Sequence, residues 1–182
     1  ATVDFPAAAV TLPDMERTLG IVFRAFGGDS GLRVQSAVSA QHDARRGLLA
    51  RIAGTGLKAT HAAVDGATLR LPARIALFSD ASLNRDLYVW LAALAAHDVP
   101  GNEEWIVRNQ RATAVTLARL PGMAARYRRL VDACLALRLA PEALPAEEAA
   151  QERALRAALA APGSVRTLPP LTRKNAKTLQ AM

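Results

Sequence analysis

Four side chains with oxygen atoms alternate along one short stretch of this 182-residue chain. Asp80, Ser82, Asn84 and Asp86 come shortly after an apolar run that ends at Phe78. Carboxylate and hydroxyl oxygens are ligands that Mg²⁺ prefers, so the stretch could hold a hard metal ion. The same residue types also favour a helix start, where a side-chain oxygen accepts a hydrogen bond from a free backbone N–H. The stretch is therefore either a metal site or the polar start of a helix.

Two observations favour the helix start. The metal-binding loop of von Willebrand factor A domains has an Asp-x-Ser-x-Ser core, whereas the third position here is Asn84. Those domains also need strands that alternate with helices, and this chain offers no such series. We therefore consider Asp80 and Ser82 as metal ligands and reject them. We expect Ser79, Asp80 or Ser82 to cap a helix instead.

The other residues with catalytic potential do not form a recognised set. His97 ends the same helix, but Ala93 stands one turn earlier, so the His pair and Glu of a zinc peptidase are missing. His42 and His61 fall in other predicted elements, and spacing neither assembles nor excludes a site. Cys134 has apolar neighbours, which favours a buried structural thiol over a nucleophile. We predict no catalytic residue, no metal and no cofactor.

Charge and composition limit the class of partner. The net charge is +7, but the segment 164–182 holds four basic residues and no acidic one, so the rest is only mildly basic. We therefore do not expect nucleic-acid binding. The strongest local cluster of charge is Arg126, Arg128 and Arg129, on a predicted helix face, which we propose as a partner-binding surface. A single Cys favours a reducing cytoplasm, and no apolar run reaches the ~20 residues of a membrane span.

Periodicity predicts a mostly helical α+β fold. Hydrophobic residues make up 51% of the chain but aromatic residues only 4%, and such small side chains favour close helix packing. A small antiparallel β element near the N-terminus should pack on a bundle of five to six helices. In chain order the predicted elements are a helix at 13–26, a strand at 32–38, a helix at 42–53, a hairpin at 58–71 around Asp65-Gly66, and helices at 83–96, 103–120, 123–138 and 145–160.

Several details of these helices can be predicted as well. The helix at 83–96 has one apolar face with Leu87, Trp90, Leu91 and Leu94. Asn102 is the expected cap of the next helix, with Glu103 and Glu104 in its first turn. The polar groups at 84–86 and 109–111 lie beside apolar stripes, so some should be buried and hydrogen-bonded between helices. We place one domain at 1–163 and a basic, Pro-containing linker or tail at 164–182.

A series of short phrases resembles one family. The order and approximate spacing of these phrases are similar to the amino-terminal region of the CbbO/NorD proteins, from about residue 5 to 169. The phrases are FPAAAVTL at 5–12, FRAFGGD at 23–29, LP at 71–72 with IALF at 75–78, LNRDLY at 83–88, WLAA at 90–93 and LPG at 120–122. None of them is a catalytic signature.

The resemblance implies a partner role. Proteins of this family work with a hexameric AAA+ ATPase of the MoxR type, called CbbQ or NorQ, which supplies the nucleotide chemistry. CbbO-type members help to activate Rubisco, and NorD-type members support maturation of nitric oxide reductase. A von Willebrand factor A domain near the carboxyl end of the family protein contacts the target. In the sequence of the family proteins, the metal site of that domain therefore lies far downstream of the phrase at 83–88.

The chain ends at Met182, before any such domain, and we interpret it as an amino-terminal piece. We predict a cytoplasmic, non-catalytic adaptor domain that docks on the ATPase ring, with Rubisco slightly preferred over nitric oxide reductase as target. The alternatives are a degenerate metallopeptidase-like or metal-binding module around Asp80 and His97, and a basic nucleic-acid-binding domain.

Overall fold

The computed structural model confirms an α+β fold that is mostly helical. It describes residues 4–29, 31, 33–36, 63–65, 68–99 and 101–171. The α-helices among them are α1 (Leu12–Ala25), α3 (Ala81–His97), α4 (Trp105–Arg119), α5 (Ala124–Ala136) and α6 (Ala146–Ala160). The strands are β1 (Val10–Thr11), β2 (Arg33–Ser36), β3 (Ala63–Asp65), β4 (Thr68–Leu71) and β5 (Arg74–Ile75). Short 3₁₀ turns lie at Pro6–Ala8 (η1), Pro121–Met123 (η2) and Pro141–Ala143 (η3).

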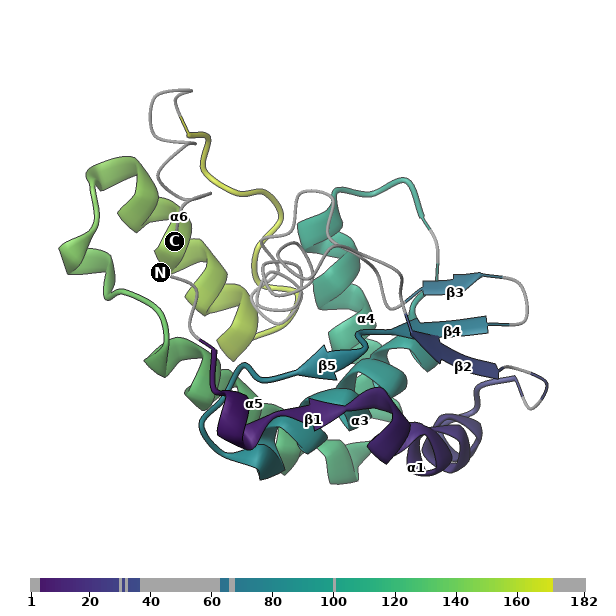
Figure 1. The fold of residues 1–182 in the computed structure, drawn as a ribbon. Coiled ribbons are helices and arrows are strands. Elements are labelled where there is room, and N and C mark those ends of the chain that lie inside the picture. Colours follow the sequence, from purple (N-terminus) through teal and green to yellow (C-terminus); the bar gives the residue numbers. More distant parts are fainter. Residues whose placement is uncertain are drawn as a thin grey trace.

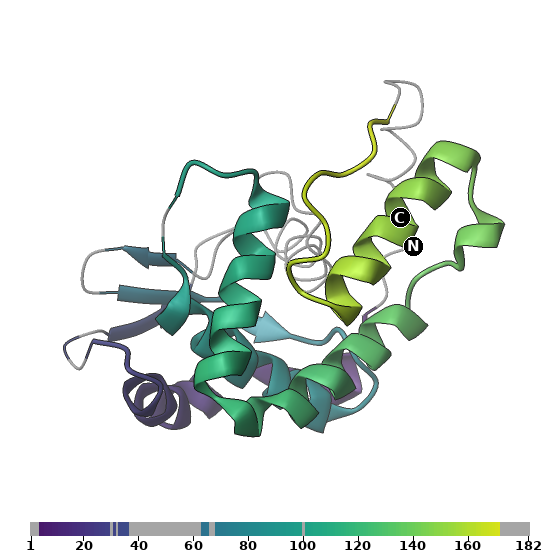
Figure 2. The same ribbon diagram turned by 180° about the vertical axis from the view of Figure 1, so that it is seen from behind.

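The elements are spread along the molecule. β2, β3, β4 and α1 lie toward one end, α6 lies toward the other, and β1 and β5 lie between them (Figure 1). Seen from behind, α5 runs below α4 and α6, which stand next to each other (Figure 2). No helix in the described part of the chain has the length and apolar character that crossing a membrane requires.

The strands form two small sheets. β1 pairs with β5 in the antiparallel direction, with Val10 opposite Ile75. In the second sheet β4 lies between β2 and β3, antiparallel to β3 but parallel to β2. The prediction that the strands at 32–38 and 58–71 pair only in the antiparallel direction is therefore wrong for β2. The stretch of chain between β2 and β4 is longer than the dozen or so residues that a parallel crossover needs, so β4 can run in the same direction as β2.

Most predicted helices are confirmed close to their expected ends. At the start of α1 the Asp14 carboxylate accepts hydrogen bonds from the Thr11 N–H, at 3.3 Å, and from its hydroxyl, at 2.6 Å. Gly27 follows α1 with a φ of 90°, a left-handed conformation that favours glycine. The predicted helix at 42–53 lies outside the described residues, as does Gly66 of the predicted Asp65-Gly66 turn.

The predicted start of α4 is wrong. The helix begins at Trp105, after Glu104, and no side chain caps it. Asn102 is exposed and lies before the first turn. The Glu103 carboxylate, which lies before the first turn, forms an ion pair with Arg111 of α4.

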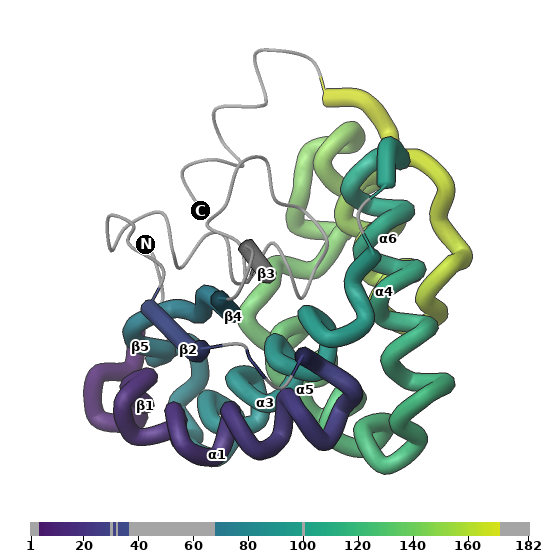
Figure 3. The backbone as a smooth tube through the Cα atoms, turned by 90° about the vertical axis from the view of Figure 1, so that its right-hand side faces the viewer, coloured from purple at the N-terminus to yellow at the C-terminus, as the bar shows by residue number. Residues whose placement is uncertain are grey.

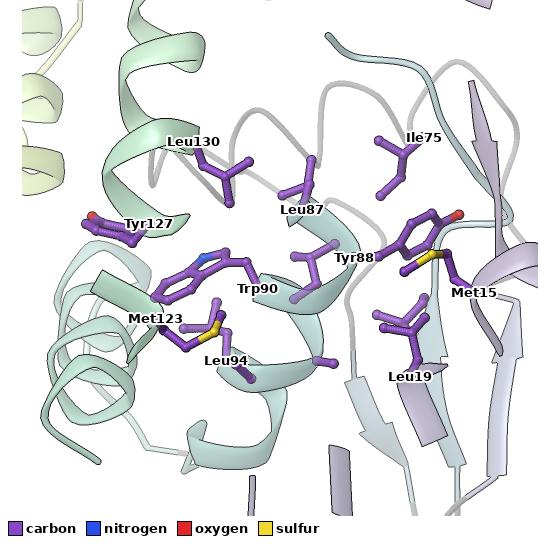
Figure 4. Packing of buried hydrophobic residues seen from close by; sticks show 14 of the residues in the cluster. Met15, Leu19, Ile75, Leu87, Tyr88, Trp90, Leu94, Met123, Tyr127 and Leu130 are labelled. Atoms are coloured by element: carbon purple, nitrogen blue, oxygen red, sulfur yellow. The ribbon is translucent and has the colours of Figure 1, made fainter. Parts of the chain in front are cut away.

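Helix α3 is the centre of the molecule. It is enclosed between α1 and α5, as Figure 3 shows. In the core, Tyr88 points toward Met15 and Leu19 of α1, whereas Trp90 points toward Tyr127 and Met123 (Figure 4). The prediction of a single apolar face is therefore wrong, because α3 is buried around most of its circumference. The Trp90 and Tyr127 ring centroids lie 4.8 Å apart.

Small residues allow the neighbouring helices to approach α3. Ala92 and Ala93 are fully buried, and their small side chains add little bulk between α3 and its neighbours.

The Tyr88 hydroxyl donates to the Pro72 carbonyl at 2.8 Å, and the Tyr127 hydroxyl donates to the Leu159 carbonyl at 2.9 Å. Both buried tyrosines thus have their hydroxyl satisfied by backbone of another segment.

Asn84 connects three segments of the core. Its side chain is fully buried, and the amide makes four hydrogen bonds. Nδ2 donates to the Ala8 carbonyl at 2.8 Å and to the Phe78 carbonyl at 2.9 Å. Oδ1 accepts from the N–H of Leu77 at 3.1 Å and of Phe78 at 3.0 Å. The full hydrogen-bonding capacity of one amide therefore joins η1, the segment after β5 and α3.

We expect the substitution Asn84→Ala to lower the free energy of unfolding by at least about 3 kcal/mol, because it leaves four buried backbone groups without a partner. Urea denaturation followed by circular dichroism measures this loss. Asn102→Ala is the matched control and should change stability by less than about 0.5 kcal/mol, as an exposed surface position does. Equal stability of the two variants would contradict the role of Asn84.

Candidate functional site

The N-terminus of α3 has the cap that its sequence predicts. Asp80 is the N-cap residue, and its Oδ1 accepts a hydrogen bond from the Ser82 N–H at 2.7 Å. The Ser82 hydroxyl donates to Oδ2 of the same carboxylate at 2.8 Å. These two hydrogen bonds, first from the hydroxyl and then from the backbone, hold the pKa of the Asp80 carboxyl below its ordinary value of 3.8. Both carboxylate oxygens are therefore used by the helix cap.

The four alternating residues do not converge on one point. Asn84 faces the core and bonds to backbone, whereas the Asp86 carboxylate is bound by two arginines of α5. Asp80 remains at the surface, at the start of the helix. Among the described residues, no three His, Cys, Asp or Glu side chains come together as a metal site would need.

The three arginines predicted as a contact surface have different roles. Arg126 Nε donates to Asp86 Oδ1 at 2.7 Å. Arg129 Nη1 donates to Asp86 Oδ2 at 3.0 Å, and its Nη2 lies 3.3 Å from the Ser82 hydroxyl. These two residues join α5 to α3 through an Asp86 side chain that is only 15% exposed.

Arg128 differs from its two neighbours. Successive residues lie about 100° apart around a helix, so Arg128 is directed away from the flank that Arg126 and Arg129 share. It is exposed and makes no hydrogen bond or ion pair within the described part of the chain. The structure therefore brings two of the predicted contact residues together and leaves Arg128 alone at the outer surface of α5.

The remaining predicted residues have structural surroundings. His97 is buried at the end of α3, with its Nδ1 2.9 Å from the Ala93 carbonyl oxygen. Cys134 is fully buried, and this burial raises the pKa of its thiol to about 11. The thiol thus lacks the exposure and the thiolate character of a nucleophile, as predicted. His42 and His61 lie outside the described residues.

One buried charge cluster was missed by the sequence analysis. The Glu152 side chain on α6 is 4% exposed. Arg138, just after α5, donates from Nε to Oε1 of Glu152 at 2.9 Å and to Oε2 at 3.0 Å, and Arg156 donates from Nε to Oε1 at 2.9 Å. The spacing of Glu152 and Arg156 by four residues is a signal for a helical pair that could have been used. The contact with Arg138 depends on how α5 and α6 meet, which no local pattern specifies.

We expect Asp80→Ala to lower the thermal unfolding midpoint at pH 7. The folded-state pKa of Asp80 is depressed, so its stabilising effect is present above the ordinary value and is lost as the pH falls through the folded-state pKa. The difference from the unmodified chain should therefore shrink as the pH falls below about 3.8. Differential scanning fluorimetry between pH 7 and pH 2.5 measures it, with Asp132→Ala on α5 as the control that leaves the midpoint unchanged.

The same assay separates the cap from a metal site. Millimolar Mg²⁺ should leave the midpoint of the unmodified chain where it was. A rise with Mg²⁺ that is lost in Asp80→Ala would contradict the cap assignment.

Comparisons with known proteins identify relatives. The chain is 46% identical over 169 residues to Protein NorD of Stutzerimonas stutzeri, 43% identical over 173 residues to an uncharacterized protein of Pseudomonas aeruginosa, and 38% identical over 146 residues to Protein NorD of Brucella abortus. These matches cover 93%, 95% and 74% of the chain. They cover only 28%, 28% and 23% of the relatives, so the chain spans about a quarter of their length.

No family model matches the chain, and no solved structure is significantly similar to it. The relatives agree with the resemblance that the short phrases carry, and identity of 46% extends over nearly all of the chain. The chain is therefore a domain of the CbbO/NorD family.

Proposed function

We propose that this chain is a non-catalytic adaptor domain of a NorD-like protein, and that the whole protein assists the maturation of nitric oxide reductase. The observation that carries the proposal is the similarity to proteins named NorD over most of the chain. The family resemblance implies that NorD-type members support this maturation. Because the relatives are named NorD, we now prefer nitric oxide reductase as the target. Rubisco, slightly preferred from the sequence, becomes the second candidate.

The geometry supports a role without chemistry of its own. Four of the described side chains that could act as acids, bases, ligands or nucleophiles have structural roles: Asp80 caps a helix, Asp86 and Glu152 are bound by arginines, and Cys134 is buried. Groups held in such bonds stabilise the fold, and using them in a reaction would leave buried polar partners unsatisfied. An adaptor needs only a stable scaffold and an exposed contact surface.

We propose that the contact surface for a hexameric MoxR-type AAA+ ATPase lies on the outer side of α5. Arg128 is exposed and has a free guanidinium, which can form a bidentate pair with a carboxylate of a partner. Arg126 and Arg129 contribute indirectly, because their bonds to Asp86 fix the orientation of α5 on α3. Changing all three arginines together would mix loss of contact with loss of this interhelical bond, so single changes are the better test.

We expect Arg128→Glu to weaken binding of the chain to the ATPase ring by at least about tenfold, because it replaces an attractive charge pair with a repulsive one. Co-migration in size-exclusion chromatography and a binding titration by interferometry measure the effect. Arg153→Glu is the matched control, since Arg153 is an exposed arginine on another helix, α6, with the same change in charge. The control should bind as the unmodified chain does.

Both variants should keep the unfolding midpoint of the unmodified chain, because neither arginine is bonded within the described residues. If Arg128→Glu binds as tightly as the Arg153→Glu control, the α5 surface is not the contact.

The choice of target can be tested in cells. We expect deletion of the gene for the whole protein to lower nitric oxide reductase activity in isolated membranes, with a normal level of the reductase polypeptide, because maturation and not synthesis would fail. Rubisco activity in the same strain should be unchanged, and a plasmid copy of the gene should restore the reductase. Loss of Rubisco activity alone would reverse the order of the two candidates.

A further inference from the structure

The residues that follow α6 stay in contact with α4 and α6. Residues 163–169, here called the exit strap, turn back and pass between α4 and α6, as the yellow segment in Figure 2 shows. Gly163 has a φ of 103°, a left-handed conformation that permits this reversal directly after the helix. The Ser164 N–H donates to the Ala161 carbonyl at 3.0 Å, and its hydroxyl donates to the Ala157 carbonyl at 3.2 Å.

One buried glutamine of α4 holds the exit strap. Gln110 is 4% exposed, and its Oε1 accepts from the N–H of Gly163 at 2.9 Å and of Val165 at 3.1 Å. Its Nε2 donates to the Val165 carbonyl at 2.7 Å and to the Ile106 carbonyl of its own helix at 3.0 Å. All four hydrogen bonds of the amide are therefore used, and three of them go to backbone of the strap.

Apolar contacts and a second glutamine extend the attachment. Val165 and Leu168 pack on a small core cluster that is separate from the main core. Its buried members are Ile106 of α4 and Leu155 and Ala158 of α6. Farther along the chain, Gln151 of α6 donates from Nε2 to the Pro169 carbonyl at 3.1 Å.

From these contacts we infer that the exit strap is a rigid junction that Gln110 holds in place by hydrogen bonds. The strap therefore fixes the position and the direction in which the chain leaves the domain. Backbone that is bonded at 163, 165 and 169 cannot rotate freely as a flexible linker would. The linker predicted at 164–182 would then begin only after the strap, although that boundary itself stays a prediction. The role of this junction rests on the proposed adaptor function. If the domain docks on the ATPase ring, a rigid strap would transmit movements of the docked domain to the residues that follow it.

The inference is tested by trypsin cleavage after Arg166, an exposed arginine in the middle of the strap. In the unmodified chain this bond should be cleaved much more slowly than in a free peptide of residues 160–171, because cleavage needs local opening. Gln110→Ala removes three bonds to the strap, so we expect cleavage at Arg166 to become at least about tenfold faster. Asn109→Ala, at the neighbouring position of α4, is the control and should cleave at the rate of the unmodified chain. Equal rates for Gln110→Ala and the control would overturn the inference.

Hydrogen exchange of the unmodified chain decides the question even if Gln110→Ala does not fold. The Val165 amide should exchange at least about a hundredfold more slowly than in the free peptide, because its N–H is bonded to Gln110. Exchange at the peptide rate would overturn the rigid junction. Both measurements use the chain alone, so failure of ring binding would count against the adaptor proposal and leave the junction untouched.

Discussion

The fold depends on the hydrogen bonds that one buried amide, Asn84, supplies to irregular backbone. Segments that lack helix or sheet partners can enter a core only if their N–H and carbonyl groups are bonded, since an unpaired buried group is costly. Asn84 meets this need for η1 and for the segment between β5 and α3. The N-terminal segment is thereby held against α3, and the pair of β1 with β5 lies beside it.

Gln110 applies the same principle at the other end of the described chain. It satisfies the backbone of the exit strap as Asn84 satisfies that of the N-terminal segment. Charged residues join the helices between these two points: Asp86 connects α3 with α5, and Glu152 connects α6 with the end of α5. The buried polar residues Asn84, Gln110 and Glu152 thus stabilise tertiary contacts, which suits a scaffold whose role is to hold a contact surface in place.

Local patterns in the sequence predicted the elements well and their partners less well. The ends of α1 and α6 followed from apolar periodicity and from the positions of Pro and Gly. The cap of α3 was narrowed to three neighbouring residues by residue type, and the structure identifies Asp80 among them. The start of α4 was misplaced, because Glu103 forms its bond with Arg111, eight residues ahead, and not with the first turn. The apolar positions of α3 were underestimated, since Tyr88, Ala92 and Ala93 become buried only when α1 and α5 enclose the helix. The parallel pair of β2 with β4 and the bonds of Gln110 to the strap join residues far apart in sequence, and no spacing rule specifies them.

We propose that this domain is a docking module whose outer α5 surface meets a MoxR-type ATPase ring. Hydrogen-exchange mass spectrometry of the chain with and without the assembled ring tests it most directly. We expect slower exchange in and next to α5 when the ring is present, with the core of α3 unchanged. Exchange that is the same everywhere with and without the ring, at concentrations well above those of the two proteins in cells, would contradict it.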